Sequence, residues 1–192
     1  MTNEERNSWD QRYRDTPDTA PLPIAVVRDY AHLLPVEGRA LDLACGRGGT
    51  ALLLARCGLT VDAWDLSAVA LGQLEAAAAR DGLTIASRVR DVVAEPPPPA
   101  CYDAITVGYF LDRRLTPAIM AALRPGGLLF YQTFGPERVG DRGPRNPAYR
   151  LATGELLHLF APLRVHLYRE DGVPGDHARG LRGEVQFIGA RV

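Results

Sequence analysis

Short apolar runs alternate along the chain with longer segments in which apolar residues recur at helical spacing. The apolar runs predict strands at 40–44, 59–64, 84–89, 102–107, 128–134, 163–169 and 184–191. The longer segments predict helices at 24–34, 50–57, 68–80, 115–123 and 154–160. Strands that alternate with helices and end in a hairpin predict an α/β fold, a sheet with helices on both faces.

Individual residues mark several element ends. Ser67 and Thr153 are suitable N-caps for the helices that follow them, and Pro35 ends the first predicted helix. Four consecutive prolines within 95–100 exclude a helix between the third and fourth strands, so we expect an extended connection there. The sequence Pro-Gly-Gly at 125–127 predicts a turn before the fifth strand.

The stretch 39–66, RALDLACGRGGTALLLARCGLTVDAWDL, carries the most information about function. It predicts a strand, a glycine turn, a buried helix and a second strand that ends at Asp65. Glycines at 46, 48 and 49 let a ligand approach the main chain closely. An acidic residue about 20 positions after such a turn can accept hydrogen bonds from ribose hydroxyls, so the stretch indicates a nucleoside-bearing cofactor.

Two kinds of cofactor compete for this stretch. Gly46-x-Gly48-x-x-Ala51 satisfies the loose dinucleotide fingerprint, which would indicate an NAD(P)-dependent oxidoreductase. Asp42 lies inside the first strand, and its negative charge disfavours a pyrophosphate at the helix that follows. The carboxylate suits a cofactor that carries an ammonium and a sulfonium. It can also act indirectly, by holding the turn amides that meet the cofactor.

Composition limits the remaining possibilities. A chain of 192 residues predicts one domain, with a lid segment at 1–36 and a core at 37–192. The net charge of −1 provides no field that would attract nucleic acid. All basic residues are arginine, which excludes a Schiff-base lysine and a P-loop lysine.

Cysteine and histidine patterns give no metal site or disulfide framework. The 3 cysteines are unpatterned and indicate a reducing compartment, and the 4 histidines lack metal-ligand spacing. The polar start predicts no signal peptide, and no apolar run reaches membrane-spanning length. We therefore expect a cytoplasmic monomer or homodimer that acts on a small molecule, without nucleic-acid or membrane partners.

The pattern hhDhxxGxG at 40–48 resembles the first motif of class I S-adenosylmethionine-dependent methyltransferases. LRPGGLLFYQTF, Asp65 and Asp91 match later parts of that family. WDQRY, FLDRRLTPAI, YQTF and NPAYRLATGELLHLF are more narrowly similar to small bacterial methyltransferases of the tellurite-resistance type. The resemblance covers nearly the whole chain. It implies a three-layer, doubly wound Rossmann-like sheet of seven strands, the last of them antiparallel.

The resemblance also implies a cofactor site at the carboxyl ends of the parallel strands, where such sheets bind ligands. The turn after the first strand would meet the methionine part, and Asp65 the ribose. Asp91 would accept from the adenine amino group beside the Val92 amide, and Gly108 or Tyr109 would line the path to the sulfonium. The full set is Asp42, Ala44, Cys45, Gly46, Gly48, Asp65, Leu66, Asp91, Val92, Gly108 and Tyr109.

The acceptor side is predicted from the two segments long enough to cover the site, the N-terminal segment and the loop 135–150. The candidates are Arg12, Tyr13, Arg113, Tyr131, Gln132, Arg145 and Tyr149. Arginines there could attract an anionic acceptor, although any single one is more simply explained as a solvated residue, less clearly so for Arg113, which follows the end of the fourth strand. Asn146-Pro147-Ala148-Tyr149 resembles a motif of DNA methyltransferases but follows the wrong strand, so we interpret it as a turn that docks Tyr149.

Methyl transfer needs mainly orientation and exclusion of water, because the cofactor already carries the electrophile. A general base is needed only where the acceptor must lose a proton, so no catalytic residue is assigned from the sequence. A thiol or an oxyanion of tellurium or selenium is the acceptor class considered first, and amines and carboxylates stay open as acceptors. A catalytically silent S-adenosylmethionine-binding module stays an alternative to an enzyme.

Overall fold

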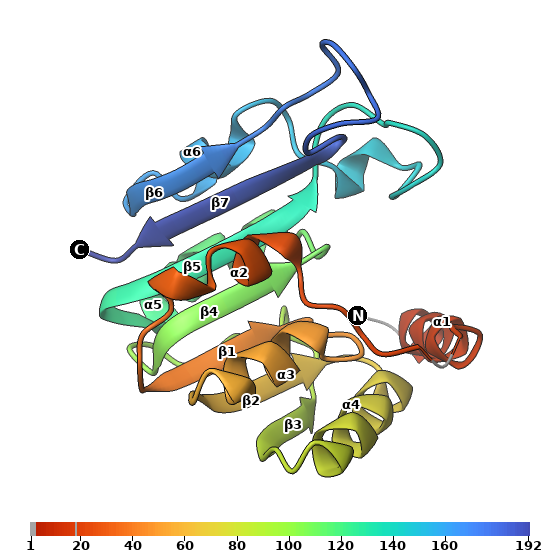
Figure 1. Cartoon of the computed structure of the whole chain (residues 1–192), viewed down its shortest axis with the longest axis vertical. Coiled ribbons are helices and arrows are strands. Elements are labelled where there is room, and N and C mark those ends of the chain that lie inside the picture. The colour runs from red at the N-terminus through yellow and green to blue at the C-terminus, as the bar shows by residue number, and fades with distance from the viewer. Residues whose placement is uncertain (1–2, 18) are drawn as a thin grey trace.

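A seven-stranded mixed sheet forms the centre of the structure (Figure 1), a computed structural model that describes residues 3–17 and 19–192. The spatial order is β3-β2-β1-β4-β5-β7-β6, and β7 is antiparallel to both of its neighbours. The predicted fold class, with an antiparallel last strand, is confirmed. The strands are β1 (Arg39–Leu43), β2 (Thr60–Asp65), β3 (Ile85–Val89), β4 (Tyr102–Gly108), β5 (Leu123–Phe134), β6 (Arg164–Arg169) and β7 (Glu184–Ala190).

Helices cover both faces of the sheet and so complete the three layers (Figure 1). One face carries α2 (Ala25–Asp29), α3 (Gly49–Arg56) and α4 (Ala68–Arg80), and the other carries α5 (Thr116–Ala122) and α6 (Glu155–Leu159). The remaining helix, α1 (Asn3–Arg14), lies beyond the sheet edge and contacts α4. Single 3-10 turns are η1 (Ala31–Leu33), η2 (Arg113–Leu115) and η3 (Pro147–Tyr149).

The sheet separates two apolar cores. Leu41, Ile105 and Phe187 belong to the core under α5 and α6, whereas Leu54 and Leu74 belong to the core under α2, α3 and α4. The central strands β1 and β4 are buried at nearly every position because both of their faces are covered. This burial fixes the positions of the strand ends at which the predicted site lies.

Several local predictions are confirmed by the structure. The helix α4 has the predicted bounds, and the Ser67 hydroxyl accepts a hydrogen bond from the Ala70 amide at 3.1 Å. The proline segment 95–100 is extended, without a helix between β3 and β4. A hollow of about 190 Å³ lies on the side of the sheet near this segment, lined by Trp64, Tyr102 and Pro98 among others.

Three local predictions are wrong. The helix expected at 24–34 is broken into α2 and η1 at Tyr30. Residues 125–127 are not a free turn: they form a bulge inside β5, because Gly126 N donates to Arg191 O and Arg191 N to Gly127 O. Thr153 does not cap α6, which begins after Gly154 in a left-handed conformation.

Among the residues that the structure describes, no helix is both long and apolar enough to cross a membrane. The cytoplasmic location and the division of the chain into a lid at 1–36 and a core at 37–192 stay predictions.

Candidate functional site

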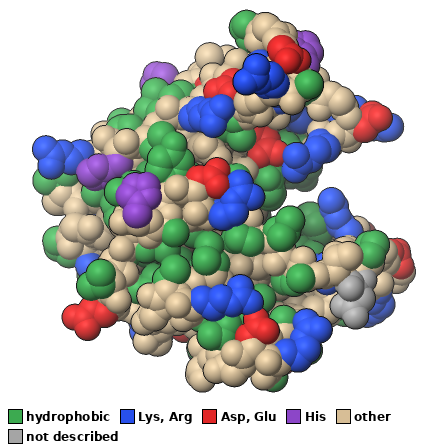
Figure 2. Space-filling view, in the orientation of Figure 1, with side chains coloured by type: hydrophobic (Ala, Val, Ile, Leu, Met, Phe, Trp, Pro, Cys, Tyr) green, Lys and Arg blue, Asp and Glu red, His purple; other side chains and the backbone are tan. Residues whose placement is uncertain are grey.

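The carboxyl ends of β1, β2 and β4 meet at one edge of the sheet, where the space-filling view shows an indentation (Figure 2). The strand order changes direction between β1 and β4, and ligands of open α/β sheets bind at such a switch point. Ala44 and Tyr109 follow these two strands, and both have left-handed backbones, with φ of 55° and 53°. Strained non-glycine residues gather at functional sites, so both strand ends are candidates.

The glycine turn after β1 is shaped by close packing. Gly46 and Gly48 have φ of 54° and 75°, and a Cβ at Gly48 would lie 2.3 Å from Leu74 Cδ1. Cys45 N donates to Trp64 O, which ties the turn to β2. Burial raises the pKa of the Cys45 thiol, in keeping with a small space-filling residue and not a nucleophile.

Asp42 acts inside the fold. Its Oδ2 accepts from the Ala51 amide at 3.0 Å, and its Oδ1 accepts from the Thr106 hydroxyl at 2.8 Å. The carboxylate therefore joins β1, the first turn of α3 and β4. Burial raises the pKa of Asp42 to about 7. These contacts favour the indirect role, in which Asp42 fixes the turn that meets the cofactor.

Asp65 holds the turn from the next strand. Its Oδ2 accepts from Gly46 N at 2.8 Å and its Oδ1 from Ser67 N at 2.9 Å. Burial raises the pKa of Asp65, although both amide bonds favour its ionised form. The carboxylate thus lies between the glycine turn and the start of α4.

The helix α1 covers this turn through polar contacts. Asp10 Oδ1 accepts from the Ser67 hydroxyl at 2.5 Å and from Val69 N at 3.3 Å, and Gln73 Nε2 donates to Tyr13 O at 3.1 Å. The Tyr13 hydroxyl lies 2.8 Å from the point that a Cβ on Gly46 would occupy. The N-terminal segment therefore reaches the site, as the sequence predicts.

A second set of side chains lies at the carboxyl ends of β4 and β5. Glu184 Oε2 accepts from the Tyr109 hydroxyl at 3.0 Å and from Gln132 Nε2 at 2.7 Å. Glu184 Oε1 pairs with Arg142 at 3.2 Å. The Tyr109 ring lies 5.1 Å from the Phe134 ring. A buried carboxylate therefore lies beside the rings of Tyr109 and Phe134, on the other side of the switch point from the glycine turn.

Comparison with known proteins decides between the two kinds of cofactor. A family model described as a methyltransferase domain matches residues 40–127. A ubiquinone biosynthesis O-methyltransferase of Xanthomonas axonopodis pv. citri is 28% identical over 182 residues, which covers 91% of this chain and 73% of that protein. The chain is a class I methyltransferase that uses S-adenosylmethionine.

Solved structures share the fold of the methyltransferase. TehB from Haemophilus influenzae has a TM-score of 0.71 and 19% identity, over 96% of this chain and 67% of that one. Geranyl diphosphate C-methyltransferase from Streptomyces coelicolor A3(2), crystallised with S-adenosyl-L-homocysteine, has a TM-score of 0.69 and 14% identity, with 100% of both chains covered. At these identities the likeness concerns the fold alone.

The structure brings most of the predicted cofactor residues of the methyltransferase together. Those from Asp42 to Gly48, with Asp65 and Leu66, surround the ends of β1 and β2, and Gly108 and Tyr109 end β4. Val92 is buried after β3, and Asp91 Oδ1 accepts from Val93 N at 3.0 Å and from Ala94 N at 3.2 Å. Their contacts with the cofactor stay predictions.

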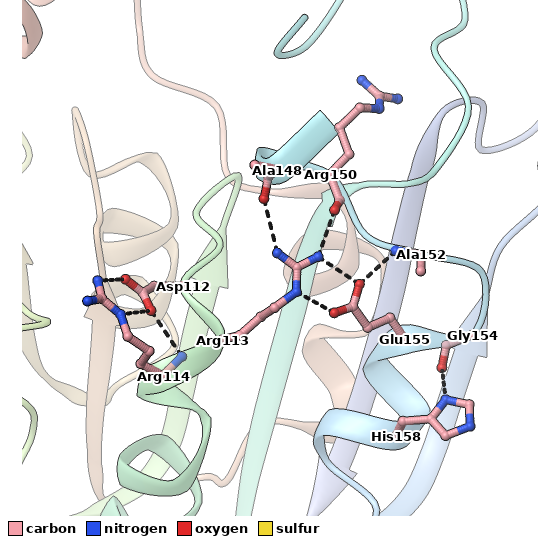
Figure 3. Close-up of polar contacts among 9 residues, drawn as sticks. All are labelled: Asp112, Arg113, Arg114, Ala148, Arg150, Ala152, Gly154, Glu155 and His158. Carbon is pink, nitrogen blue, oxygen red and sulfur yellow. Dashed lines mark hydrogen bonds and ion pairs between the residues drawn. The ribbon is translucent and has the colours of Figure 1, made fainter. Parts of the chain in front are cut away.

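Arg113 has a bracing role that the sequence did not indicate (Figure 3). Its guanidinium donates to both carboxylate oxygens of Glu155, at 2.5 and 2.9 Å, and to the carbonyl oxygens of Ala148 and Arg150, at 3.0 and 2.9 Å. Arg113 therefore fastens the loop 135–150 to α6. These contacts do not support the predicted attraction of an anionic acceptor.

The other predicted acceptor residues divide into buried and exposed groups. Tyr131 is buried and donates to Phe110 O at 2.7 Å, so it belongs to the core of the methyltransferase. Gln132 is also buried, but it contacts Glu184 and thus the site. Tyr149 is 57% exposed, so the prediction that it docks is wrong; the neighbouring Arg150 is buried instead.

Arg145 is exposed on the loop 135–150, and Arg12 is exposed on α1, where it lies over the Trp9 ring at 5.1 Å. Sequence reasoning missed Glu184, Arg142 and Phe134. One signal for Glu184 was its place at the start of the last predicted strand. In an antiparallel register that residue pairs with Phe134, the last residue of β5.

Proposed function

We propose that the methyltransferase transfers its methyl group to a hydroxyl oxygen of a small molecule. The observation that carries this proposal is the contact at the end of β4 between the hydroxyl of the partly exposed Tyr109 and the buried Glu184 carboxylate. An aromatic ring and a hydrogen-bond acceptor suit a flat molecule that bears a hydroxyl group. The name of the relative from Xanthomonas axonopodis pv. citri, an O-methyltransferase, supports the same class of acceptor.

The residues at the ends of β1 and β2 fit the cofactor. Gly46 and Gly48 supply the left-handed backbone of the turn, and Asp65 ends β2, where a carboxylate can accept hydrogen bonds from ribose hydroxyls. When bound, S-adenosylmethionine supplies a methyl group on a positively charged sulfur. Asp42 and Asp65 hold the turn in place, so its geometry is set before the cofactor arrives.

A thiol, or an oxyanion of tellurium or selenium, is the second candidate class of acceptor. An oxyanion would be expected to meet unpaired cationic side chains. Arg113 is instead bound to Glu155, and Arg142 to Glu184. The charges at the site therefore favour a neutral acceptor.

Calorimetry with S-adenosylhomocysteine tests the proposed cofactor site. We expect micromolar binding by the native protein and at least about tenfold weaker binding by Asp65→Asn, since hydrogen bonds to a charged group contribute about 1.5–3 kcal/mol. Asp62→Asn is the matched control, because Asp62 lies on the same strand, is also 7% exposed and pairs with Arg39 away from the turn. Binding of NADH without binding of S-adenosylhomocysteine would favour an oxidoreductase.

Turnover with catechol, thiophenol and selenite tests which class of acceptor is methylated. We expect S-adenosylhomocysteine to form with catechol and much more slowly with the other two. Methylation of thiophenol or selenite alone would reject the hydroxyl acceptor. Cofactor binding without turnover on any of the three would favour a silent binding module.

A further inference from the structure

We propose that Glu184 is the general base of the methyltransferase, the group that takes the proton of the acceptor hydroxyl. This inference rests on the proposed function and extends it, because it assigns a catalytic residue and requires an acceptor with a removable proton. It is carried by the position of Glu184, by its burial and by its hydrogen bonds.

The position of Glu184 follows from the antiparallel last strand. Because β7 runs opposite to β5, its first residue pairs with Phe134, the last residue of β5. The start of β7 therefore lies at the same edge as the carboxyl ends of the parallel strands (Figure 1). Tyr109, at the end of β4, reaches Glu184 from the switch point.

Glu184 is buried, although its one charged partner among the described residues is exposed to solvent. The residue is 6% exposed, and its only charged partner among the described residues is Arg142, whose side chain is 75% exposed. Burial of a carboxylate without a buried counter-charge costs several kcal/mol. A neutral side chain could join β4, β5 and β7 at lower cost. A carboxylate at the sheet edge where ligands bind is a candidate for proton transfer.

The hydrogen bonds orient the carboxylate. Tyr109 and Gln132 both donate to Oε2, and Gln132 is itself fixed, since its Oε1 accepts from Val26 N at 2.8 Å and from Gln186 Nε2 at 3.2 Å. The other oxygen, Oε1, faces the exposed Arg142 of the loop 135–150. An acceptor that enters from solvent would therefore reach Oε1 by displacing Arg142.

Tyr109 is not the base. Burial and the neighbouring Glu184 raise the pKa of Tyr109 to about 12, so its hydroxyl stays protonated near neutral pH and donates to Glu184. Tyr109 and Arg142 are the titratable groups that contact Glu184. The Tyr109 ring, 40% exposed beside Phe134, offers the acceptor a flat surface.

The reaction balances without another reactant. The acceptor oxygen forms a bond to the methyl carbon while the bond from that carbon to sulfur breaks, so the positive sulfur becomes a neutral thioether. The hydroxyl proton moves to Glu184 Oε1. The positive sulfur and the carboxylate are both neutralised, and the proton leaves to solvent when the product departs.

A comparison of catechol with the more acidic 4-nitrocatechol tests the proton transfer. General-base catalysis contributes about 10²–10⁴-fold, so we expect Glu184→Gln to lose at least about 100-fold in kcat with catechol near pH 7. The loss should be much smaller with 4-nitrocatechol, which ionises without help. Tyr109→Phe should lower kcat with catechol, because the Glu184 carboxylate loses one of the hydrogen bonds that orient it.

Absorbance of bound 4-nitrocatechol supplies a readout that does not depend on turnover. In the presence of S-adenosylhomocysteine at pH 6, the native protein should bind it as the coloured anion, and Glu184→Gln as the neutral form. Asp62→Asn is the matched control, since Asp62 is also buried and pairs with Arg39 away from the site. It should change thermal stability without changing the pH profile or the spectrum.

The outcomes separate the two proposals. If the native protein methylates neither catechol, the hydroxyl acceptor and the base are both rejected. If it methylates both, but Glu184→Gln keeps the native pH profile and the native spectrum, the base alone is rejected. Equal loss with the two catechols would show that Glu184 only maintains the fold, and would also reject the base.

Discussion

Replacement of Asp42 by asparagine should remove a pH-dependent destabilisation of the folded state. Asp42 is buried between Ala51 N and the Thr106 hydroxyl, and an asparagine side chain can keep both bonds. The native carboxyl group has a pKa raised from 3.8 to about 7. The folded protein therefore holds a proton that the unfolded chain releases, and its stability falls as the pH rises from about 4 to 7.

The magnitude follows from the two pKa values. Each pKa unit corresponds to about 1.4 kcal/mol, so the rise to about 7 implies a loss of about 4 kcal/mol at most. Part of this loss occurs below pH 5. Between pH 5 and 8 the free energy of unfolding of the native protein should fall by about 2.5 kcal/mol relative to Asp42→Asn.

Urea denaturation at pH 5, 6, 7 and 8, followed by circular dichroism, measures this difference. Asp141→Asn is the control, because the side chain of Asp141 is fully exposed and should give no pH-dependent change relative to the native protein. A constant difference between Asp42→Asn and the native protein across this range would refute the reasoning. It would mean that Asp42 ionises as easily in the folded protein as in the unfolded chain.

Two further predictions concern the turn and the loop. Gly48→Ala should lower the free energy of unfolding by about 1–3 kcal/mol, because alanine is strained in the left-handed backbone and its Cβ would meet Leu74. Gly72→Ala is the control and should not lower stability, because a Cβ at this position of α4 meets nothing. Thermal denaturation and S-adenosylhomocysteine binding check both variants. Arg113→Ala and Glu155→Ala should be non-additive in a double-mutant cycle, with a coupling of about 1 kcal/mol. Additive losses would contradict the proposed brace.

The arrangement of the glycine turn and Asp65 could be predicted because these parts are close in sequence. The glycine turn and Asp65 lie in one strand-turn-helix-strand unit, and the rule that parallel strands end at one edge places them together. Asp42 was predictable as a residue of the site, whereas its two bonding partners were not. Thr106 is 64 residues away, and only the register of β1 and β4 brings it to Asp42.

The acceptor half could not be predicted in the same way. Tyr131 and Gln132 are adjacent in β5, but successive side chains point to opposite faces, so one lies in the core and the other at Glu184. The contact between Tyr109 and Glu184 spans 75 residues and needs the exact start of β7. Glu155, the partner of Arg113, follows the loop 135–150, and that loop has no periodic pattern from which the contact could be predicted.

The two halves of the site are physically joined by Gln132. Its amide group donates to the Glu184 carboxylate and accepts from Val26 N in the first turn of α2. The segment that leads into α2 crosses the end of β4, where a Cβ on Gly108 would lie 2.6 Å from Ile24 Cγ2, and Ile24 N donates to the Thr50 hydroxyl of α3. One chain of contacts thus runs from the helix behind the glycine turn to the carboxylate on the acceptor side. Methyl transfer requires the two reactants to be held in line, and this chain fixes the cofactor turn and the base relative to each other.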